Sequence, residues 1–351
     1  MPWVSFVVSN ILLSTPLALC AWGAQRWGRH YAFARILWVG VLIKLLTPPL
    51  VSISLNETPA SPACREGLCG CPHHQRSKLS IGVTFGLLGV WVFGAATTGW
   101  TAWGRWSRFE GLLAHAAPAP LDWQTAAERL SVELSIRRSP RVLMVPGQLP
   151  PMVVPGWGRL RLLVPRELVA GLGESQRTVL LLHELIHIRS RDHWVRLLEL
   201  AVRIVYWWLP VVGFISRQLR TCEEICCDAA VVSHRPQARR DYAGLLLDVI
   251  DFVSPMRPPV EQATGMSTVD DLEQRLRGIL HGEPGQRGRW PVGWAAAVII
   301  LGVVPWGVEY DWIRRSTAGA PIEVRLPYQE SKTPSETCES TPELSTFCCP
   351  S

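Results

Sequence analysis

The sequence of 351 residues predicts a mainly α-helical membrane protein, with four transmembrane helices and an α+β domain between the third and the fourth. Two observations support this fold class. Charged residues make up 18% of the chain, against about 25% in a typical soluble domain. Four stretches are also long and apolar enough to cross a bilayer, which takes about 20 residues. They are residues 3–22, 32–55, 79–103 and 290–313.

The first apolar stretch is expected to remain as an anchor. It has no basic region before it and no small-residue cleavage site, both of which a secretory signal peptide carries. The chain also has no run of Lys and Arg with aromatic residues between them, so we expect no direct nucleic-acid binding.

The loop charges predict the orientation of the chain. Arginines lie between stretches one and two, after stretch three and before stretch four, and basic loops stay on the cytoplasmic side. The exceptions, Arg314 and Arg315, follow the fourth stretch. We therefore expect a multi-pass protein of the cytoplasmic membrane, in contact with membrane lipid, with its large domain inside the cell. The supporting residues are Arg26, Arg29, Arg35, Arg105, Arg108, Arg287 and Arg289.

This orientation divides the chain into four parts. Residues 1–103 hold three helices and a short outer loop, 56–78, while residues 104–289 form the cytoplasmic domain. Residues 290–313 are the fourth helix and residues 314–351 a short outer tail. Within the domain we expect a helix over about 122–136, β-rich runs at 141–145 and 160–164, and a long helix from about Glu174. Residues 204–215 are too short to span and favour a half-buried helical hairpin.

The long helix carries the motif His183-Glu184-Leu185-Ile186-His187. Residues four apart share a helix face, so both imidazoles can bind one ion, while Glu184 can reach a water on that ion. This is the pattern of zinc proteases, with two histidine ligands and a glutamate general base. The surrounding residues are apolar, and burying this polar trio costs several kcal/mol unless a metal compensates. A chance match in a long helix is the alternative.

A third ligand is expected from a later helix, and Glu224 is the candidate. It lies 37 residues after His187, which leaves room for a helix, a reversal and a returning helix. Asp228, one turn further on, can accept a hydrogen bond from a ligand histidine. Glu223 is the competing ligand, and a solvated acidic helix face is the competing interpretation of the whole segment.

Several roles stay open between named residues. The candidates for the group that stabilises the oxyanion are His193, Arg191, His234 and Arg235, which the sequence does not separate. An extended substrate can pair with residues 152–154 or with 160–164, although ordinary core strands explain both runs equally well. Asp192 can orient a ligand-bearing helix or form a surface salt bridge with Arg189 or Arg196.

The ten cysteines divide by predicted side. Six fall outside the cell, where an even number permits disulfides, although the loop spacing also allows a soft-metal site. Inside, Cys222 and Cys226 are four apart and can in principle bind zinc, but packing in the helix is the simpler role. The outer six are Cys64, Cys69, Cys71, Cys338, Cys348 and Cys349.

The segments HELIHIRSRDHW and EEICCDAAVV, separated by a Trp- and Pro-rich hairpin, resemble the membrane peptidases of the β-lactam sensor-transducer type. The likeness extends over residues 1–313 in layout and is most specific over 140–250. It implies a gluzincin-like fold, zinc bound by His183, His187 and Glu224, Glu184 as the catalytic residue, and an active site at the cytoplasmic face. Penicillin receptors of this type carry a large outer sensor domain. Only 38 residues follow the last stretch here, so we do not expect β-lactam sensing.

The resemblance implies a zinc-dependent endopeptidase that cleaves a protein, such as a transcriptional repressor or itself, in regulatory proteolysis. Two other functions remain open: a membrane quality-control protease, and a non-catalytic receptor or scaffold. The presence of Glu184 disfavours a scaffold, which needs no general base.

Overall fold

The computed structural model describes residues 2–28, 30–47, 51–54, 78–156, 158–253, 265–281 and 306–309. Most of the predicted fourth helix, most of the outer loop and the tail lie outside these residues, as do all six outer cysteines. The described part is mainly helical, with one four-stranded sheet and a short parallel pair formed by β1 (Val51–Ser54) and β6 (Trp306–Glu309).

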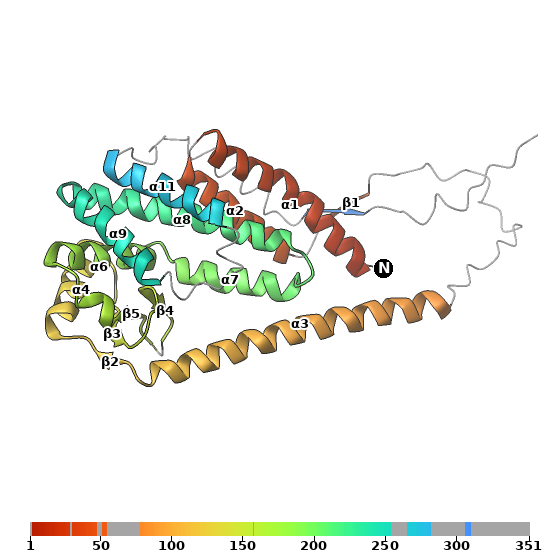
Figure 1. Cartoon of the computed structure of the whole chain (residues 1–351). Helices are drawn as coiled ribbons and strands as arrows, with labels where there is room; N and C mark the ends of the chain where they lie inside the picture. The colour runs from red at the N-terminus through yellow and green to blue at the C-terminus, as the bar shows by residue number, and fades with distance from the viewer. Residues whose placement is uncertain are drawn as a thin grey trace, which may run out of the picture. The chain divides into compact units, whose positions relative to one another are not determined.

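Three helices cover the first part of the chain: α1 (Pro2–Arg26), α2 (Tyr31–Leu46) and α3 (Lys78–Leu113). α1 and α2 pack against each other (Figure 1). Among the described residues, Gly82–Leu113 of α3 is long and apolar enough to cross a membrane, and it overlaps the third predicted stretch. The second predicted stretch is helical over fewer residues than expected. α2 ends at Leu46 because Pro48 and Pro49 follow, and proline cannot continue a helix.

The sheet follows α3 and has the order β2-β3-β5-β4. β3 (Arg141–Val145) and β5 (Arg161–Pro165) are parallel neighbours, and they correspond to the two predicted β-rich runs. β4 (Met152–Val154) pairs antiparallel with β5 and forms one edge, while β2 (Ala117–Pro118) forms the other. The helix α4 (Leu121–Glu133) contacts β3, and the short α5 (Arg166–Val169) follows β5.

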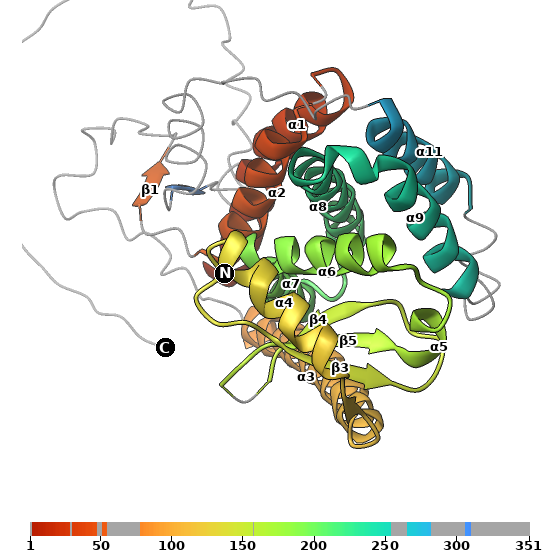
Figure 2. The same cartoon turned by 90° about the vertical axis from the view of Figure 1, so that its left-hand side faces the viewer.

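Helix α6 (Glu174–Arg189) lies at the centre of this domain. At its start, the Gly173 amide donates to the Gln176 side chain at 3.1 Å, which satisfies one terminal N–H group. It contacts α4, α8, α9 and β4 (Figure 2), and most of its apolar residues are buried. They include Val179, Leu181, Leu182 and Leu185.

Two helices after α6 form a hairpin, α7 (Asp192–Val205) and α8 (Val211–His234). The reversal at residues 206–210 leaves Trp207 and Trp208 partly exposed, with 40% and 44% of their surface accessible. α8 then runs beside α2 and contacts α6. α9 (Arg239–Val253) packs against α6 and against α11 (Gly265–His281), and α11 also packs against α8. The return of α8 is what brings its acidic residues beside the histidines of α6.

Candidate metal centre

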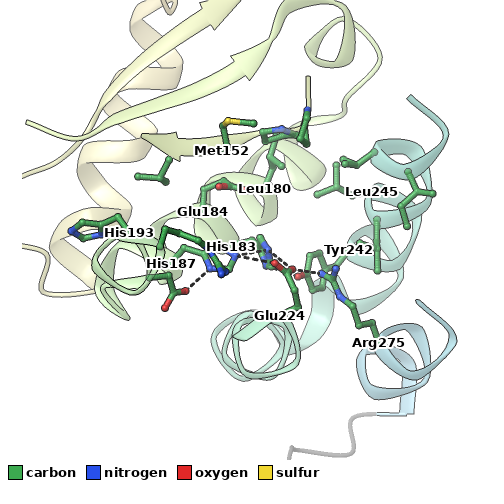
Figure 3. Close-up of a pocket in the computed structure, with 18 residues that line it drawn as sticks. Met152, Leu180, His183, Glu184, His187, His193, Glu224, Tyr242, Leu245 and Arg275 are labelled. Carbon is green, nitrogen blue, oxygen red and sulfur yellow. Dashed lines mark hydrogen bonds and ion pairs between the residues drawn. The ribbon is translucent and has the colours of Figure 1, made fainter. Parts of the chain in front are cut away.

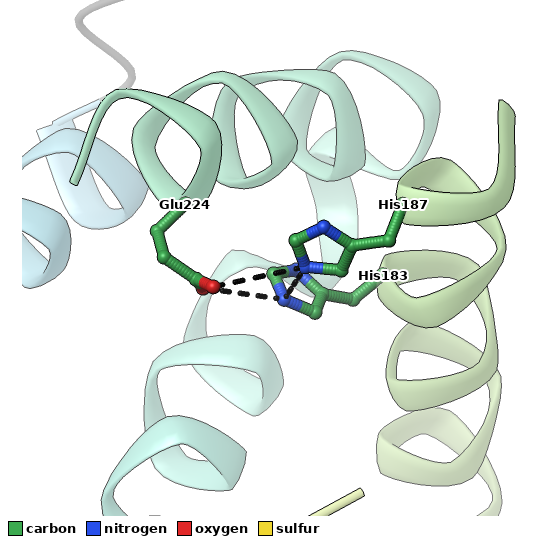
Figure 4. Close-up of side chains that lie close together, drawn as sticks. All are labelled: His183, His187 and Glu224. Atoms are coloured by element: carbon green, nitrogen blue, oxygen red, sulfur yellow. Dashed lines mark hydrogen bonds and ion pairs between the residues drawn. The ribbon is translucent and has the colours of Figure 1, made fainter. Parts of the chain in front are cut away.

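His183 and His187 lie one turn apart on α6 and face Glu224 on α8 (Figure 4). Their Nε2 atoms are 3.1 Å apart. The Glu224 carboxylate lies 3.6 Å from His183 Nε2 through Oε2 and 3.8 Å from His187 Nε2 through Oε1. The structure thus brings three potential ligand atoms to one point, from two helices separated by α7.

The donor set suits a tetrahedral metal ion. Bonds of about 2.0–2.1 Å to nitrogen or oxygen place neighbouring ligands ~3.3 Å apart, close to the spacing of these three groups. Each histidine also presents Nε2 to the shared point because its Nδ1 is hydrogen-bonded elsewhere. Two neutral imidazoles and one carboxylate are the ligands of many catalytic zinc sites.

Asp192 supports His187. Its Oδ2 lies 2.6 Å from His187 Nδ1, so the ring donates this proton and keeps its Nε2 lone pair free. Burial lowers the pKa of His187, but hydrogen bonds with Asp192 and Cys227 outweigh this and raise it well above the ordinary value. The structure gives Asp192 other partners than the two roles left open for it: it accepts from His187 and pairs with Arg35, not with Arg189 or Arg196.

His183 is supported through a tyrosine. The Tyr242 hydroxyl lies 2.7 Å from His183 Nδ1 and donates to Asp228 Oδ1 at 2.5 Å. Asp228 itself is 3.7 Å from His183 Nδ1, so the hydroxyl stands between the histidine and the carboxylate. A hydroxyl that donates to a carboxylate can accept from the ring N–H, which again leaves Nε2 free.

Arg275 of α11 forms ion pairs with both Asp228 and Glu224. It donates to Asp228 at 2.7 and 2.9 Å and lies 3.1 Å from Glu224 Oε2. Burial works to raise the pKa of Glu224, but His183 and Arg275 outweigh it and hold this pKa well below its usual range. Sequence reasoning missed Tyr242 and Arg275. The only signal for either was a polar residue inside an otherwise apolar helix face.

Glu184 lines the same pocket as the three potential ligands and is 7% exposed (Figure 3). Burial raises its pKa, although the neighbouring histidines oppose the shift. A carboxylate in this setting takes up a proton more readily than an exposed one.

The pocket has a volume of about 370 Å³ and is bounded by α6, α9 and the edge strand β4. Met152 and Val153 of β4 line it, whereas β5 lies inside the sheet and cannot offer a free edge. Of the two runs considered as a substrate-binding edge, 160–164 is therefore excluded and is an ordinary core strand, since it is paired on both sides.

Of the four residues considered as oxyanion donors, one lines the pocket and three do not. His193 lines the pocket, and its Nδ1 is buried without a hydrogen-bond partner among the described residues. His234 bonds the Ala230 carbonyl, and Arg235 pairs with Glu133, so neither lies at the pocket. Arg191 occupies the turn between α6 and α7 and is not part of the pocket lining.

Three other ligand candidates on α8 do not join this group. Glu223 points away from the histidines, where it is buried and pairs with Arg196. Cys222 and Cys226 are not among the ligand atoms that converge with His183 and His187. Cys227 approaches His187 Nδ1 at 3.4 Å, whereas Glu224 lies at the other ring nitrogen, Nε2.

Comparisons with known proteins agree with this arrangement. The family model described as "BlaR1 peptidase M56" matches residues 71–279, which include α3, the sheet, α6 and α8. The chain is also 32% identical over 71 residues to the "Regulatory protein BlaR1" of Bacillus licheniformis. That match covers 20% of this chain and 12% of the relative. Because the family model covers more than half of the chain, the protein belongs to the BlaR1 peptidase M56 family, a family of metallopeptidases.

Proposed function

We propose that this protein is a membrane-embedded, zinc-dependent endopeptidase that cleaves a protein substrate at the cytoplasmic face of the membrane. The observation that carries the proposal is the convergence of His183, His187 and Glu224 in the pocket that also contains Glu184. Family membership supports a metallopeptidase, and the apolar helix within α3 supports a membrane protein.

His183, His187 and Glu224 would hold the ion, with Asp192, Tyr242 and Asp228 fixing the two rings. When bound, zinc polarises a carbonyl and lowers the pKa of water from about 15.7 to about 7. Glu184 would act as the general base, accepting a proton from water and passing it to the leaving amine. The raised pKa of this carboxyl favours the proton-accepting step.

The substrate would bind as an extended strand along β4. Within the described sheet, β4 pairs on one side only and lies beside the pocket, and added strands bind sheet edges through main-chain hydrogen bonds. Among the predicted oxyanion donors, we favour His193 because it is the candidate whose side chain lines the pocket. An oxyanion donor of this kind is worth roughly 10²–10³ in rate.

We further propose the topology expected from the sequence: three spans within residues 1–103, a cytoplasmic domain over 104–289, a fourth span over 290–313 and a short outer tail. α3 is the span with direct support, because its apolar side chains are exposed. They include Phe85, Phe93, Trp100 and Trp103.

The proposed substrate is a protein with a regulatory role. The relative found by comparison is named a regulatory protein, and an enzyme built into a membrane with its pocket inside can act on a cytoplasmic repressor or on its own chain. The relative is matched over 12% of its length, so this regulatory role rests mainly on membership of the family.

Replacement of Glu184 with Gln tests the proposal. We expect the purified full-length protein to bind one zinc ion per chain in both forms, with substrate or self-cleavage fragments in membranes lost in the variant. Glu174→Gln is the matched control, since Glu174 is an exposed residue of the same helix and should leave both results unchanged. Persisting fragments in Glu184→Gln, or zinc content unaltered in His183→Ala, would refute the proposal.

A further inference from the structure

Arg35 connects α2 to the metal centre. It lies on the second turn of α2, and its guanidinium donates to Asp192 Oδ1 at 2.5 Å and to the Ser190 carbonyl at 2.8 Å. These partners are 155 and 157 residues away in the chain, at the junction of α6 and α7. Arg35, one of the arginines that predict the orientation of the chain, thus bonds to the end of α6, the helix that carries His183 and His187.

The Asp192 carboxylate divides its two oxygens between two partners. Oδ1 accepts from Arg35, and Oδ2 accepts from His187 Nδ1 at 2.6 Å. Because the Asp192 side chain is only 7% exposed, water contributes little to holding it in place. The direction of the carboxylate, and with it the plane of the His187 ring, therefore depends on where Arg35 lies.

A second cation, Arg196, lies near Asp192, but it is paired with two other carboxylates. Arg196 lines the pocket and interacts electrostatically with Asp192, but its hydrogen bonds go to Glu199, at 2.8 Å, and to Glu223. Arg196 is therefore not placed to replace Arg35 as the hydrogen-bond partner of Asp192 Oδ1.

The position of Arg35 is fixed by apolar packing. α2 buries one face against α1, α7 and α8 in a cluster that contains no residue of α6 or of the sheet. The members of this cluster from α2, α7 and α8 include Leu37, Trp38, Val41, Val202 and Leu219. A shift of α2 within this cluster would be transmitted to Asp192 through one guanidinium group.

We propose that Arg35 is a positioning residue of the metal centre, which fixes Asp192 and through it the ring of His187. The affinity and ligand geometry of the ion then depend on how α2 is seated against α7. This inference rests on the proposed function, because it assumes that His187 is a metal ligand.

The test compares metal binding by the full-length protein with that of three variants. The apoprotein would be titrated with Zn²⁺ against a competing chelator, and with Co²⁺, whose visible spectrum reports ligand geometry. We expect Arg35→Ala to weaken Zn²⁺ binding about tenfold and to alter the Co²⁺ spectrum, since loss of supporting groups typically costs 10–100-fold in affinity. Arg35→Lys, which restores the charge, should recover part of the affinity.

Arg161→Ala is the matched control. Arg161 pairs with Glu110 and joins α3 to β5, so it also links an apolar helix to the domain, but it touches no potential ligand. We expect it to change Zn²⁺ affinity less than twofold. Equal losses in Arg161→Ala and Arg35→Ala would show a general packing effect and overturn the inference, as would wild-type affinity and spectrum in Arg35→Ala.

A further variant keeps the test decisive if Arg35→Ala does not fold. Arg35→Met retains the aliphatic stem and its packing, so it should fold, and it should show the same loss of affinity as Arg35→Ala. If the wild-type protein itself binds no Zn²⁺ through His187, the proposed function fails first. If the wild type binds and Arg35→Met binds equally well, only the role of Arg35 is refuted.

Discussion

Removal of the Tyr242 hydroxyl should weaken metal binding through His183. In Tyr242→Phe the His183 N–H loses its acceptor at 2.7 Å, and the nearest carboxylate oxygen, on Asp228, is 3.7 Å away, beyond hydrogen-bond reach. Asp228 keeps both bonds from Arg275, so the unpaired group is the histidine. A buried group left unpaired costs about 1–3 kcal/mol, which corresponds to roughly 5- to 150-fold in Zn²⁺ affinity.

The assay is a competitive Zn²⁺ titration of the purified full-length protein, with thermal unfolding measured alongside. Tyr206→Phe is the matched control. Tyr206 is 1% exposed and its hydroxyl donates to the Leu45 carbonyl at 2.7 Å, away from the pocket. We expect it to lower the melting temperature without changing Zn²⁺ affinity. Affinity within twofold of wild type in Tyr242→Phe would refute the proposed relay from His183 to Asp228.

Three further predictions concern stability and pH. Arg275→Met should destabilise the protein by about 3–5 kcal/mol, measured by denaturant unfolding, because it leaves Asp228 and Glu224 as buried charges without their cation. Leu181→Ala, at a residue only 1% exposed in the core, should cost about 2–5 kcal/mol while zinc content in the folded protein stays at wild-type level. Zn²⁺ affinity should fall as pH falls, because protons compete for the ligand histidines; the raised pKa of His187 means that this loss begins above pH 6.5, and a titration series that is flat until below that pH would contradict it.

The local part of the site could be predicted from the sequence because it follows helix periodicity. His183, Glu184 and His187 lie within five residues of one helix, so their shared face follows from the turn length alone. Glu224 required one more step, a count of the residues needed for a helix to leave and return. The structure brings it to the two histidines, while its role as a ligand stays a prediction.

The remaining parts depend on tertiary packing, which no periodicity reports. Arg35 and Arg275 reach the site from helices at opposite ends of the described chain, and Tyr242 enters from α9. The choice between β4 and β5 as a substrate edge needed the strand order, because both runs have the same apolar character. In the same way, the end of α2 at Leu46 was not predicted, because the sequence stays apolar after Pro48 and Pro49.

The turn between α6 and α7 has a consequence for recognising such sites in other sequences. Arg191 adopts a left-handed conformation, with φ of 60°, so a turn of two residues, Ser190 and Arg191, suffices to end α6 and to direct Asp192 back toward His187. A turn this short fixes the distance along the chain, since one inserted or deleted residue would carry the aspartate to another side of the helix. The pattern His-Glu-x-x-His-x4-Asp therefore encodes a supported histidine, and a search that requires this aspartate would discard most helices in which His-Glu-x-x-His occurs by accident.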